Sequence, residues 1–150
     1  MTKLVVFRLD ELRIALLLTA VERIVCAVEV TPLPGAPAIV HGAIDMQGRI
    51  LPVLNLRRRF RLSEREIGPT DQFLIASTAR RVVALVMDEA QGVIEVEQSA
   101  IIGADRIVPD LEQFQGVVKL DDGLVLIHDL EKFFSLDEAC ALDTAMEQVE

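Results

Sequence analysis

Residues 41–56 read HGAIDMQGRILPVLNL, and a related pattern, GVVKLDDGLVLIHDL, returns at residues 116–130. The two stretches align without a gap over 15 residues, at an offset of 74. Both run apolar, then polar around a glycine, then apolar again, which is typical of a β-hairpin. The repeat predicts that the chain contains the same hairpin twice, at about residues 42–60 and 116–134.

A second repeated pattern precedes each of these hairpins. Short apolar runs that are rich in branched side chains and bounded by turn residues predict buried strands. Four such runs are present, at residues 4–9, 13–18, 73–76 and 82–87. The triplet IAL at 14–16 falls on VAL at 83–85, at an offset of 69. The chain is therefore predicted to be two copies of one unit, folded as two related β-subdomains in pseudo-symmetric contact.

The C-terminal segment predicts a helix. Ser135 and Glu138 have the S-x-x-E spacing of a capping box, in which each side chain binds a backbone N–H of the first turn. Apolar residues then recur at helical spacing, at positions 136, 139, 142, 146 and 149. We expect this helix at about 136–149, lying on the β-body or, as the alternative, on a partner protein.

Three segments are predicted to connect these elements. The segment TPLPGAP at 31–37 has three prolines, which exclude a helix or a central strand. The polar segment at 63–71 is expected to be a surface link between the halves, and 103–109 to be another loop. Pro52, inside the first hairpin, is expected to mark a sheet edge or a bulge.

The residues of the opening stretch do not fit a catalytic or cofactor site. Gly42 and Gly48 have the wrong spacing for a phosphate loop and no Lys-Ser or Lys-Thr follows, so turn formation explains them better. No nucleophile motif or zinc spacing is present, so we predict neither an enzyme nor a cofactor. Four possible metal ligands include two strand neighbours that would point to opposite faces. They are His41, Asp45, His128 and Asp129.

Composition points to protein partners. Apolar residues make up 51% of the chain and aromatic residues only 4%. A net charge of −9 opposes binding to nucleic acid and to anionic lipid. No segment reads as a signal peptide or a membrane span, so we expect a cytoplasmic protein without direct membrane insertion. Cys26 and Cys140 cannot form a redox pair or a zinc cage, and we expect buried free thiols.

Five arginines lie close together in this acidic chain, at positions 57, 58, 59, 61 and 65. Such a patch is usually a solvated strand end. The alternative is a docking surface for an acidic protein partner.

The sequence resembles the chemotaxis coupling protein (CheW-like) family, over residues 3–142. The resemblance rests on five stretches in the same order and spacing. They are VERI at 21–24, TPLPGAP at 31–37, GAIDMQGRILPVLNLRRRF at 42–60, VVALVMDEAQGVIEV at 82–96 and GVVKLDDGLVLIHDLEKFF at 116–134. The resemblance implies an all-β fold, a single domain over 1–150 with two intertwined SH3-like five-stranded barrels and a C-terminal α-helix.

The resemblance also implies a non-catalytic signal-transduction adaptor that needs no cofactor. Such a scaffold binds the regulatory domain of a chemotaxis histidine kinase, which has the same fold, and the cytoplasmic tip of a chemoreceptor. The receptor tip is expected in the groove between the subdomains, and the kinase at barrel ends in pseudo-symmetric pairs. The receptor-groove candidates are Val21, Arg23, Ile24, Asp45, Met46, Gln47 and Gly48. The kinase-contact candidates are Met87, Asp88, Val93, Leu120 and Leu124.

Two departures from the family pattern fall among the receptor-groove candidates. The family commonly reads V-x-E-I where this chain has VERI, so Arg23 replaces the usual acid. It commonly reads N-L-R-G where this chain has DMQG, so Gln47 replaces the usual arginine. Glu22 could stand in for the acid, but a one-residue shift in a strand turns a side chain to the other face. We therefore expect an adaptor with altered receptor choice.

Two rival functions remain open on the same fold. A small-molecule sensing module would have a closed apolar cavity of about 300 Å³ or more in the groove between the barrels. A structural array component would form rings or higher oligomers without a receptor.

Overall fold

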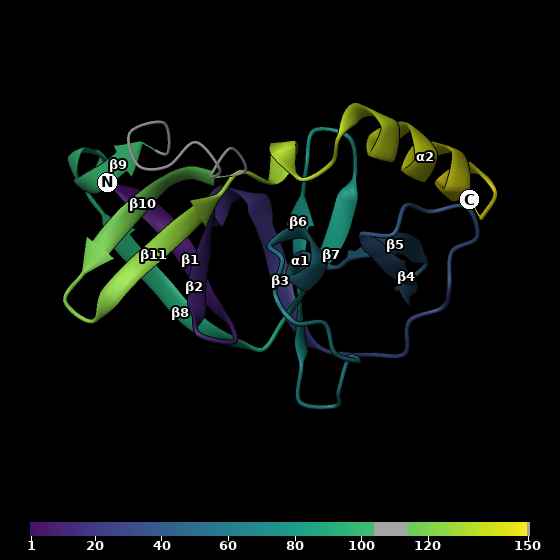
Figure 1. Cartoon of the computed structure of the whole chain (residues 1–150), viewed down its shortest axis with the longest axis horizontal. Coiled ribbons are helices and arrows are strands. Elements are labelled where there is room, and N and C mark those ends of the chain that lie inside the picture. Colours follow the sequence, from purple (N-terminus) through teal and green to yellow (C-terminus); the bar gives the residue numbers. More distant parts are fainter. Residues whose placement is uncertain (104–113, 150) are drawn as a thin grey trace.

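The computed structural model describes residues 1–103 and 114–149. Its strands form two sheets, a six-stranded one in the order β8-β1-β2-β11-β10-β9 and a five-stranded one in the order β3-β6-β7-β5-β4 (Figure 1). The strands are β1 (Thr2–Leu9), β2 (Leu12–Leu17), β3 (Val21–Cys26), β4 (Val40–Met46), β5 (Arg49–Leu54), β6 (Gln72–Ser77), β7 (Val82–Met87), β8 (Glu89–Val96), β9 (Ile101–Gly103), β10 (Phe114–Leu120) and β11 (Gly123–His128). The helices are α1 (Leu56–Arg59) and α2 (Leu136–Glu147), with short 3-10 turns η1 (Leu18–Ala20), η2 (Gln98–Ala100) and η4 (Leu130–Lys132). The predicted all-β class with a C-terminal helix is confirmed.

The two copies of the repeated unit exchange their second hairpins. Strand β2 of the first copy pairs in parallel with β11 of the second, with Ala15 opposite Ile127. Strand β7 of the second copy pairs in parallel with β5 of the first, with Ala84 opposite Val53. These two pairs are related by the repeat, because Ala84 lies 69 residues after Ala15 and Val53 lies 74 residues before Ile127. We call the sheet with β1, β2 and β8–β11 subdomain 1 and the sheet with β3–β7 subdomain 2.

Matching positions of the repeat form the cores of both barrels. The core of subdomain 1 contains Leu4, Val6, Ala15, Val118, Val125 and Ile127. Their counterparts form the core of subdomain 2, in the same order Phe73, Ile75, Ala84, Ile44, Leu51 and Val53. Successive strand residues point to opposite faces. The alternate positions are therefore left to face the middle of the molecule.

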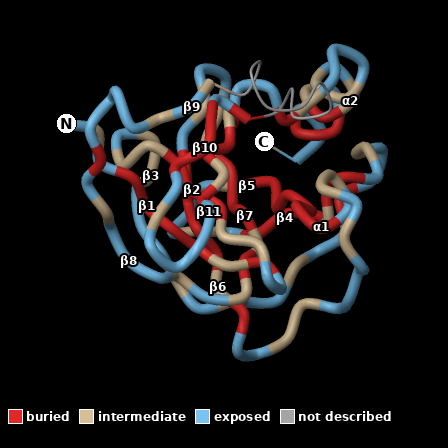
Figure 2. Tube along the Cα trace, turned by 60° about the vertical axis from the view of Figure 1, so that its left-hand side comes forward, coloured by how far each residue is buried: buried red, intermediate tan, exposed pale blue. Residues whose placement is uncertain are grey.

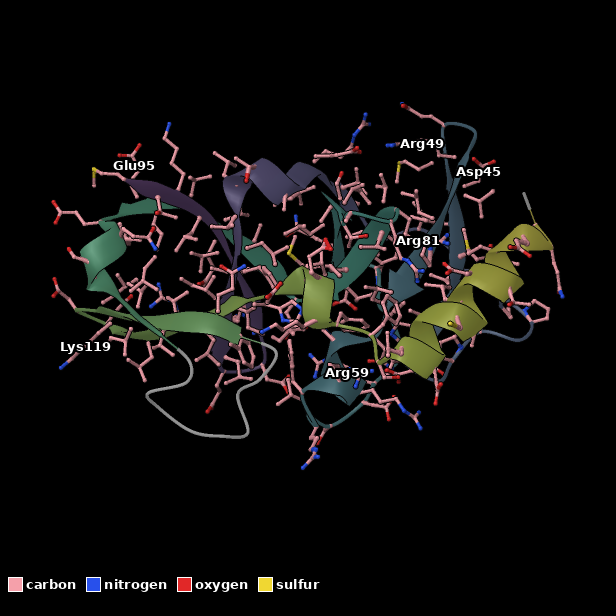
Figure 3. All side chains as sticks on the ribbon, turned by 90° about the horizontal axis from the view of Figure 1, so that it is seen from above. Asp45, Arg49, Arg59, Arg81, Glu95 and Lys119 are labelled. Atoms are coloured by element: carbon pink, nitrogen blue, oxygen red, sulfur yellow. The ribbon has the colours of Figure 1, made fainter. Side chains whose placement is uncertain are left out.

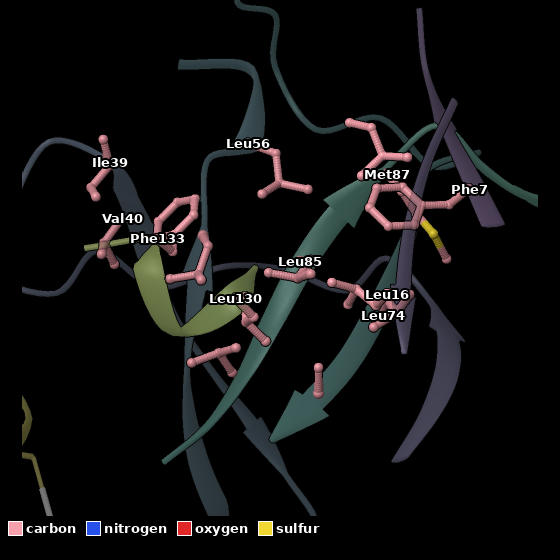
Figure 4. Packing of buried hydrophobic residues seen from close by; sticks show 14 of the residues in the cluster. Phe7, Leu16, Ile39, Val40, Leu56, Leu74, Leu85, Met87, Leu130 and Phe133 are labelled. Carbon is pink, nitrogen blue, oxygen red and sulfur yellow. The ribbon is translucent and has the colours of Figure 1, made fainter. Parts of the chain in front are cut away.

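Those alternate positions build a third, central cluster between the subdomains. Phe7 and Leu16 from the first copy pack there with Leu74 and Leu85 from the second, as Figure 4 shows. Each central strand thus packs one face into a barrel core and the other face into the central cluster. Figure 2 shows the result, with burial concentrated on the central strands and exposure along the edge strand β8.

Gly42 and Gly116 have a structural role other than the predicted turn formation. Both lie inside strands, and an added Cβ at Gly42 would overlap the Thr31 carbonyl oxygen. At Gly116 the Cβ would lie 2.6 Å from the Ile102 carbonyl oxygen. A neighbouring backbone therefore pairs antiparallel with each hairpin at the matched place, and only glycine leaves room for its close approach. The turn role belongs to Gly48, which has a φ of 89°.

Two local predictions were wrong, one for Pro52 and one for the two cysteines. Pro52 lies in β5, an interior strand between β7 and β4. The missing N–H is tolerated because the pairing with β7 begins one residue later, at Val53. Cys26 and Cys140 are both exposed, since β3 is an edge strand and the helix turns Cys140 away from its buried face. Of the loop predicted at 103–109, residues 104–109 lie outside the described residues.

Helix α2 begins as predicted and lies on the β-body. Ser135 Oγ accepts the Glu138 N–H at 3.1 Å, and Glu138 Oε1 accepts the Ser135 N–H at 2.8 Å, which completes the capping box. Of the predicted stripe, Leu142 and Met146 are buried in the central cluster. Leu136, at the start of the helix, is 87% exposed.

Candidate partner-binding site

An ion pair joins edge strand β3 to the tip of the β4–β5 hairpin at one end of subdomain 2. The register of β3 against β6 passes from Val21 directly to Arg23, so Glu22 is the extra residue of a β-bulge. A bulge takes its extra residue out of the regular alternation of faces. The Glu22 carboxylate therefore reaches Arg49, whose Nη2 donates to Oε2 at 2.8 Å. The hydrogen bond from Arg49 lowers the pKa of Glu22, and that of Arg49 is raised in turn.

The hairpin tip is held by its own backbone and by Asp45. Gln47 and Gly48 have φ values of 54° and 89°, as a tight two-residue hairpin turn requires. Asp45 Oδ1 accepts the Gly48 N–H at 2.8 Å. Figure 3 shows Asp45 and Arg49 near the tip of this hairpin. Met46 is half-buried against the barrel core, whereas Gln47 at the turn itself is exposed to solvent.

Arg23 is exposed and has no hydrogen bond or ion pair within the described residues. Its charge also lowers the pKa of Glu22, but that carboxylate is already bound by Arg49. Beside it Ile24 is 37% exposed and pairs with Leu74 of the central cluster, while Val21 is half-buried against the same cluster. The receptor-groove candidates therefore combine a free cation with an apolar surface.

The structure does not bring the five kinase-contact candidates together. Met87 is fully buried in the central cluster, so its side chain cannot touch a partner in this fold. Val93 pairs with Val5, as its repeat counterpart Ile24 pairs with Leu74, and it is 55% exposed. Leu120 is half-buried at the β10–β11 tip, and Leu124 is 57% exposed on β11. Three of the five candidates therefore retain exposed surface, on three different strands.

Asp88, the remaining kinase-contact candidate, is held in an ionic network between the subdomains. Arg57 of α1 donates to Asp88 at 2.7 Å and to Asp10, in the β1–β2 turn of subdomain 1, at 2.9 Å. Arg65 donates to the same Asp88 carboxylate at 2.8 Å and to Asp71 at 2.7 Å. Burial raises the pKa of Asp88, but the Asp10 N–H and Arg57 outweigh it and hold that pKa below its ordinary value. The Arg65 hydrogen bond likewise lowers the pKa of Asp71.

This network changes the interpretation of the predicted basic patch. Arg57 and Arg65 are bound within it, and Arg59 donates to Glu138 of α2 while its guanidinium lies over the Phe133 ring. Most of the clustered arginines therefore hold the fold together and do not form a free docking surface. The segment at 63–71 is likewise more than a surface link, since Asp71 is 3% exposed.

The possible metal ligands are not assembled, and the described residues contain no group of three side chains placed to hold a metal. His128 is buried instead among Phe60, Phe114 and Phe133. A half-open apolar pocket of about 270 Å³ lies between α2 and the β6–β7 turn, lined in part by Leu130. In the part of the chain that the structure describes, no helix is long and apolar enough to cross a membrane.

Two small β-barrels with exchanged hairpins, and an end surface of exposed charge and apolar side chains, define the class of protein to which this chain belongs. The chain belongs to the CheW-like domain family, whose model matches residues 3–138. Chemotaxis protein CheW of Treponema pallidum is 29% identical over 142 residues, covering 91% of this chain and 84% of that protein. Chemotaxis protein CheW of Bacillus subtilis is 30% identical over 129 residues, covering 85% and 83%.

A solved structure is also similar. The crystal structure of scaffolding protein TtCheW from Thermoanaerobacter tengcongensis matches with a TM-score of 0.83 at 27% identity. The match covers 91% of this chain and 94% of that one. The family resemblance and the expected fold of two β-subdomains with a C-terminal helix are therefore confirmed, except that subdomain 1 has six strands where five were expected.

Proposed function

We propose that this chain is a non-catalytic adaptor that couples a chemoreceptor tip to the regulatory domain of a histidine kinase, with altered receptor choice. It acts in the cytoplasm and reaches membrane receptor arrays through these partners. The observation that carries the altered choice is the Glu22–Arg49 ion pair. In the family pattern the acid falls at position 23 and the arginine at position 47. The pair in this chain joins the same strand and hairpin, but from positions 22 and 49.

The shifted pair changes what the surface offers to a receptor helix. The bulge allows the Glu22 carboxylate to pair with Arg49. Position 23 then carries the exposed guanidinium of Arg23, where the family pattern has a carboxylate. A basic side chain on a receptor tip would be repelled there, whereas an acidic one would be attracted. A charge exchange of this kind alters partner choice more than it alters the fold.

Kinase contact is proposed for the candidates that have exposed surface. These are Val93, Leu120 and Leu124, and Leu124 is 57% exposed. Met87 and Asp88 are left out because one is buried and the other is held by Arg57 and Arg65.

The test is a binding titration of the full chain with a purified kinase regulatory domain and with two receptor tips. One tip comes from the same genome and the other from a system whose adaptor has the usual V-x-E-I and N-L-R-G sequences. The double variant Arg23→Glu with Gln47→Arg should shift preference toward the second tip and leave kinase binding unchanged. The matched control is Arg61→Glu, which reverses the charge of another exposed arginine.

Two results would contradict the proposal in different ways. Failure to bind any kinase regulatory domain would remove the adaptor role. Equal binding of the unmodified chain to both receptor tips would remove only the altered choice.

A further inference from the structure

The internal repeat shows what covers the outer face of one barrel. In subdomain 2, Ile50 packs against the central cluster to which α2 contributes, and the same hollow is lined by Arg81 and by Val149 just beyond the helix. Asp143 of α2 accepts from Arg81 at 2.7 Å and from Arg80 at 3.0 Å. Figure 3 shows Arg81 beside α2. In subdomain 2 an apolar residue and flanking charges thus lie where α2 and the residue after it pack and form ion pairs.

Among the described residues, no helix covers the matched face of subdomain 1. Leu124 is the counterpart of Ile50, and Leu12 is the counterpart of Arg81. Leu124 alternates with the core residue Val125, so it points outward, and it is 57% exposed. Leu12 is half-buried on the same face of the neighbouring strand, because β2 and β11 pair in parallel. In Figure 1, α2 lies over the opposite end of the molecule.

Two free charges of opposite sign flank this leucine pair. Lys119 pairs with Leu124 across the β10–β11 hairpin, and Figure 3 shows it projecting from the far end of the molecule. Glu11 precedes Leu12 in the β1–β2 turn and is exposed. Within the described residues neither side chain has an ion pair. Helix α2 of a second molecule of this chain would not suit this face. Its Asp143 would lie against Glu11, whereas in subdomain 2 Asp143 pairs with Arg80.

We propose that the face formed by Leu12 and Leu124, between Glu11 and Lys119, binds an amphipathic helix of a signalling partner. The helix lays apolar residues spaced i, i+3 and i+4 on the two leucines, the spacing at which Leu142, Ala145 and Met146 of α2 pack into the central cluster. Its flank toward Glu11 is basic and its flank toward Lys119 is acidic. The inference rests on the proposed function only for the choice of partners to be tested.

The first experiment identifies what lies on the face. The full chain with p-benzoylphenylalanine at position 124 is irradiated with the kinase regulatory domain and, separately, with the cytoplasmic tip of a receptor. Mass spectrometry then maps the adducts. We expect adducts with one of these partners, confined to one side of an amphipathic helix. Adducts on strands or loops, or on a second copy of this chain, would overturn the inference.

The second experiment measures the energetic role of the face with a matched control. Leu124→Asp should weaken binding of the crosslinked partner at least about tenfold, as expected when an interface anchor is lost. Leu136→Asp changes another exposed leucine, on α2, and should leave affinity within about twofold. Circular dichroism verifies that both variants fold.

The outcomes separate this inference from the proposed function. Unchanged affinity of Leu124→Asp, or equal losses in both variants, would overturn the inference while the adaptor role stands. If the unmodified chain binds neither partner, the adaptor role and the inference fail together.

Discussion

The ends of the two barrels are closed by different polar contacts at matching places. In subdomain 2 the bulge residue Glu22 binds Arg49 at the β4–β5 tip. In subdomain 1 the bulge falls at Gln91, the counterpart of Glu22, and its side chain accepts from Arg13 at 3.2 Å. Arg13 in turn donates to Asp122 at the β10–β11 tip at 2.8 Å. The repeat has kept a polar bridge from bulge to hairpin tip while the residues that make it have diverged.

This difference separates what the fold requires from what a partner reads. Both barrels have a polar contact between the hairpin tip and the neighbouring strands, and both keep matched core residues. The charges around the ties are free to change, because exposed ion pairs contribute little to stability. Arg23 faces solvent in subdomain 2, whereas its counterpart in subdomain 1 is Gly92. The divergence at the barrel ends is therefore where partner specificity is expected.

The largest expected effect tests whether the repeat imposes the same close backbone approach on both barrels. Gly42→Ala should lower the free energy of unfolding by about 3 kcal/mol or more, because its Cβ would meet backbone atoms that cannot move aside. Gly116→Ala should cost about 2 kcal/mol, since its Cβ would lie 2.6 Å from the Ile102 carbonyl oxygen. Urea titration of each variant measures the change.

Gly68→Ala is the matched control for these glycines. Its Cβ would have one neighbouring atom within 4 Å, at 3.9 Å. The control should change the free energy of unfolding by less than about 0.5 kcal/mol. If Gly42→Ala behaves like the control, then the close approach of Thr31 does not explain the shared glycine.

The next effect concerns the network that joins the barrels. Arg57→Ala should cost about 2 kcal/mol at pH 7, because it leaves the nearly buried Asp88 with one guanidinium partner fewer. The pKa values of Asp71 and Asp88 are lowered in the folded protein. As pH falls below about 4, the unfolded chain therefore takes up protons first and the network's contribution declines. Urea titrations between pH 7 and pH 3 follow this loss.

The neighbouring Arg58 supplies the control for Arg57. It is exposed and lies 3.7 Å from the Glu64 carboxylate, so Arg58→Ala should change stability by less than about 0.5 kcal/mol. A cost of Arg57→Ala that does not shrink in acid would show that packing of the side chain, and not the ion pairs, stabilises the contact between the barrels.

The sequence predicted what depends on local pattern. Repeated apolar runs on either side of a glycine turn located the hairpins, and the S-x-x-E spacing located the start of α2, because both are set by neighbouring residues. The exchange of hairpins followed from the family resemblance. The Asp10–Arg57–Asp88 network was missed because its members are far apart in the chain and meet only after the subdomains pack.

The candidate site was predicted less completely, for related reasons. Arg49 was missed as the partner of Glu22 because only a bulge brings the two together, and a bulge is a property of strand register. Met87 was misjudged because the apolar run at 82–87 continues to the end of β7, where the central cluster buries it. One signal could have revealed Arg49. It is an arginine directly after a predicted hairpin turn, in a chain whose acid, Glu22, lies one position away from the usual acid of the family pattern.

The smallest effect tests how α2 distinguishes the two outer faces. Ser135→Ala removes one half of the capping box and should cost about 1 kcal/mol. Only the first turn of α2 should lose protection in hydrogen exchange, because Leu142 and Met146 still anchor the following turns in the central cluster. Ser135→Asp is the control, since aspartate is also a good helix cap and should restore protection. If protection is lost along the whole of α2, then the cap and not the central cluster holds the helix on subdomain 2. In that case the outer face of subdomain 2 would be as open to exchange as the matched face of subdomain 1 at Leu124. The outer faces of the two barrels would then differ less in solution than they do in the structure.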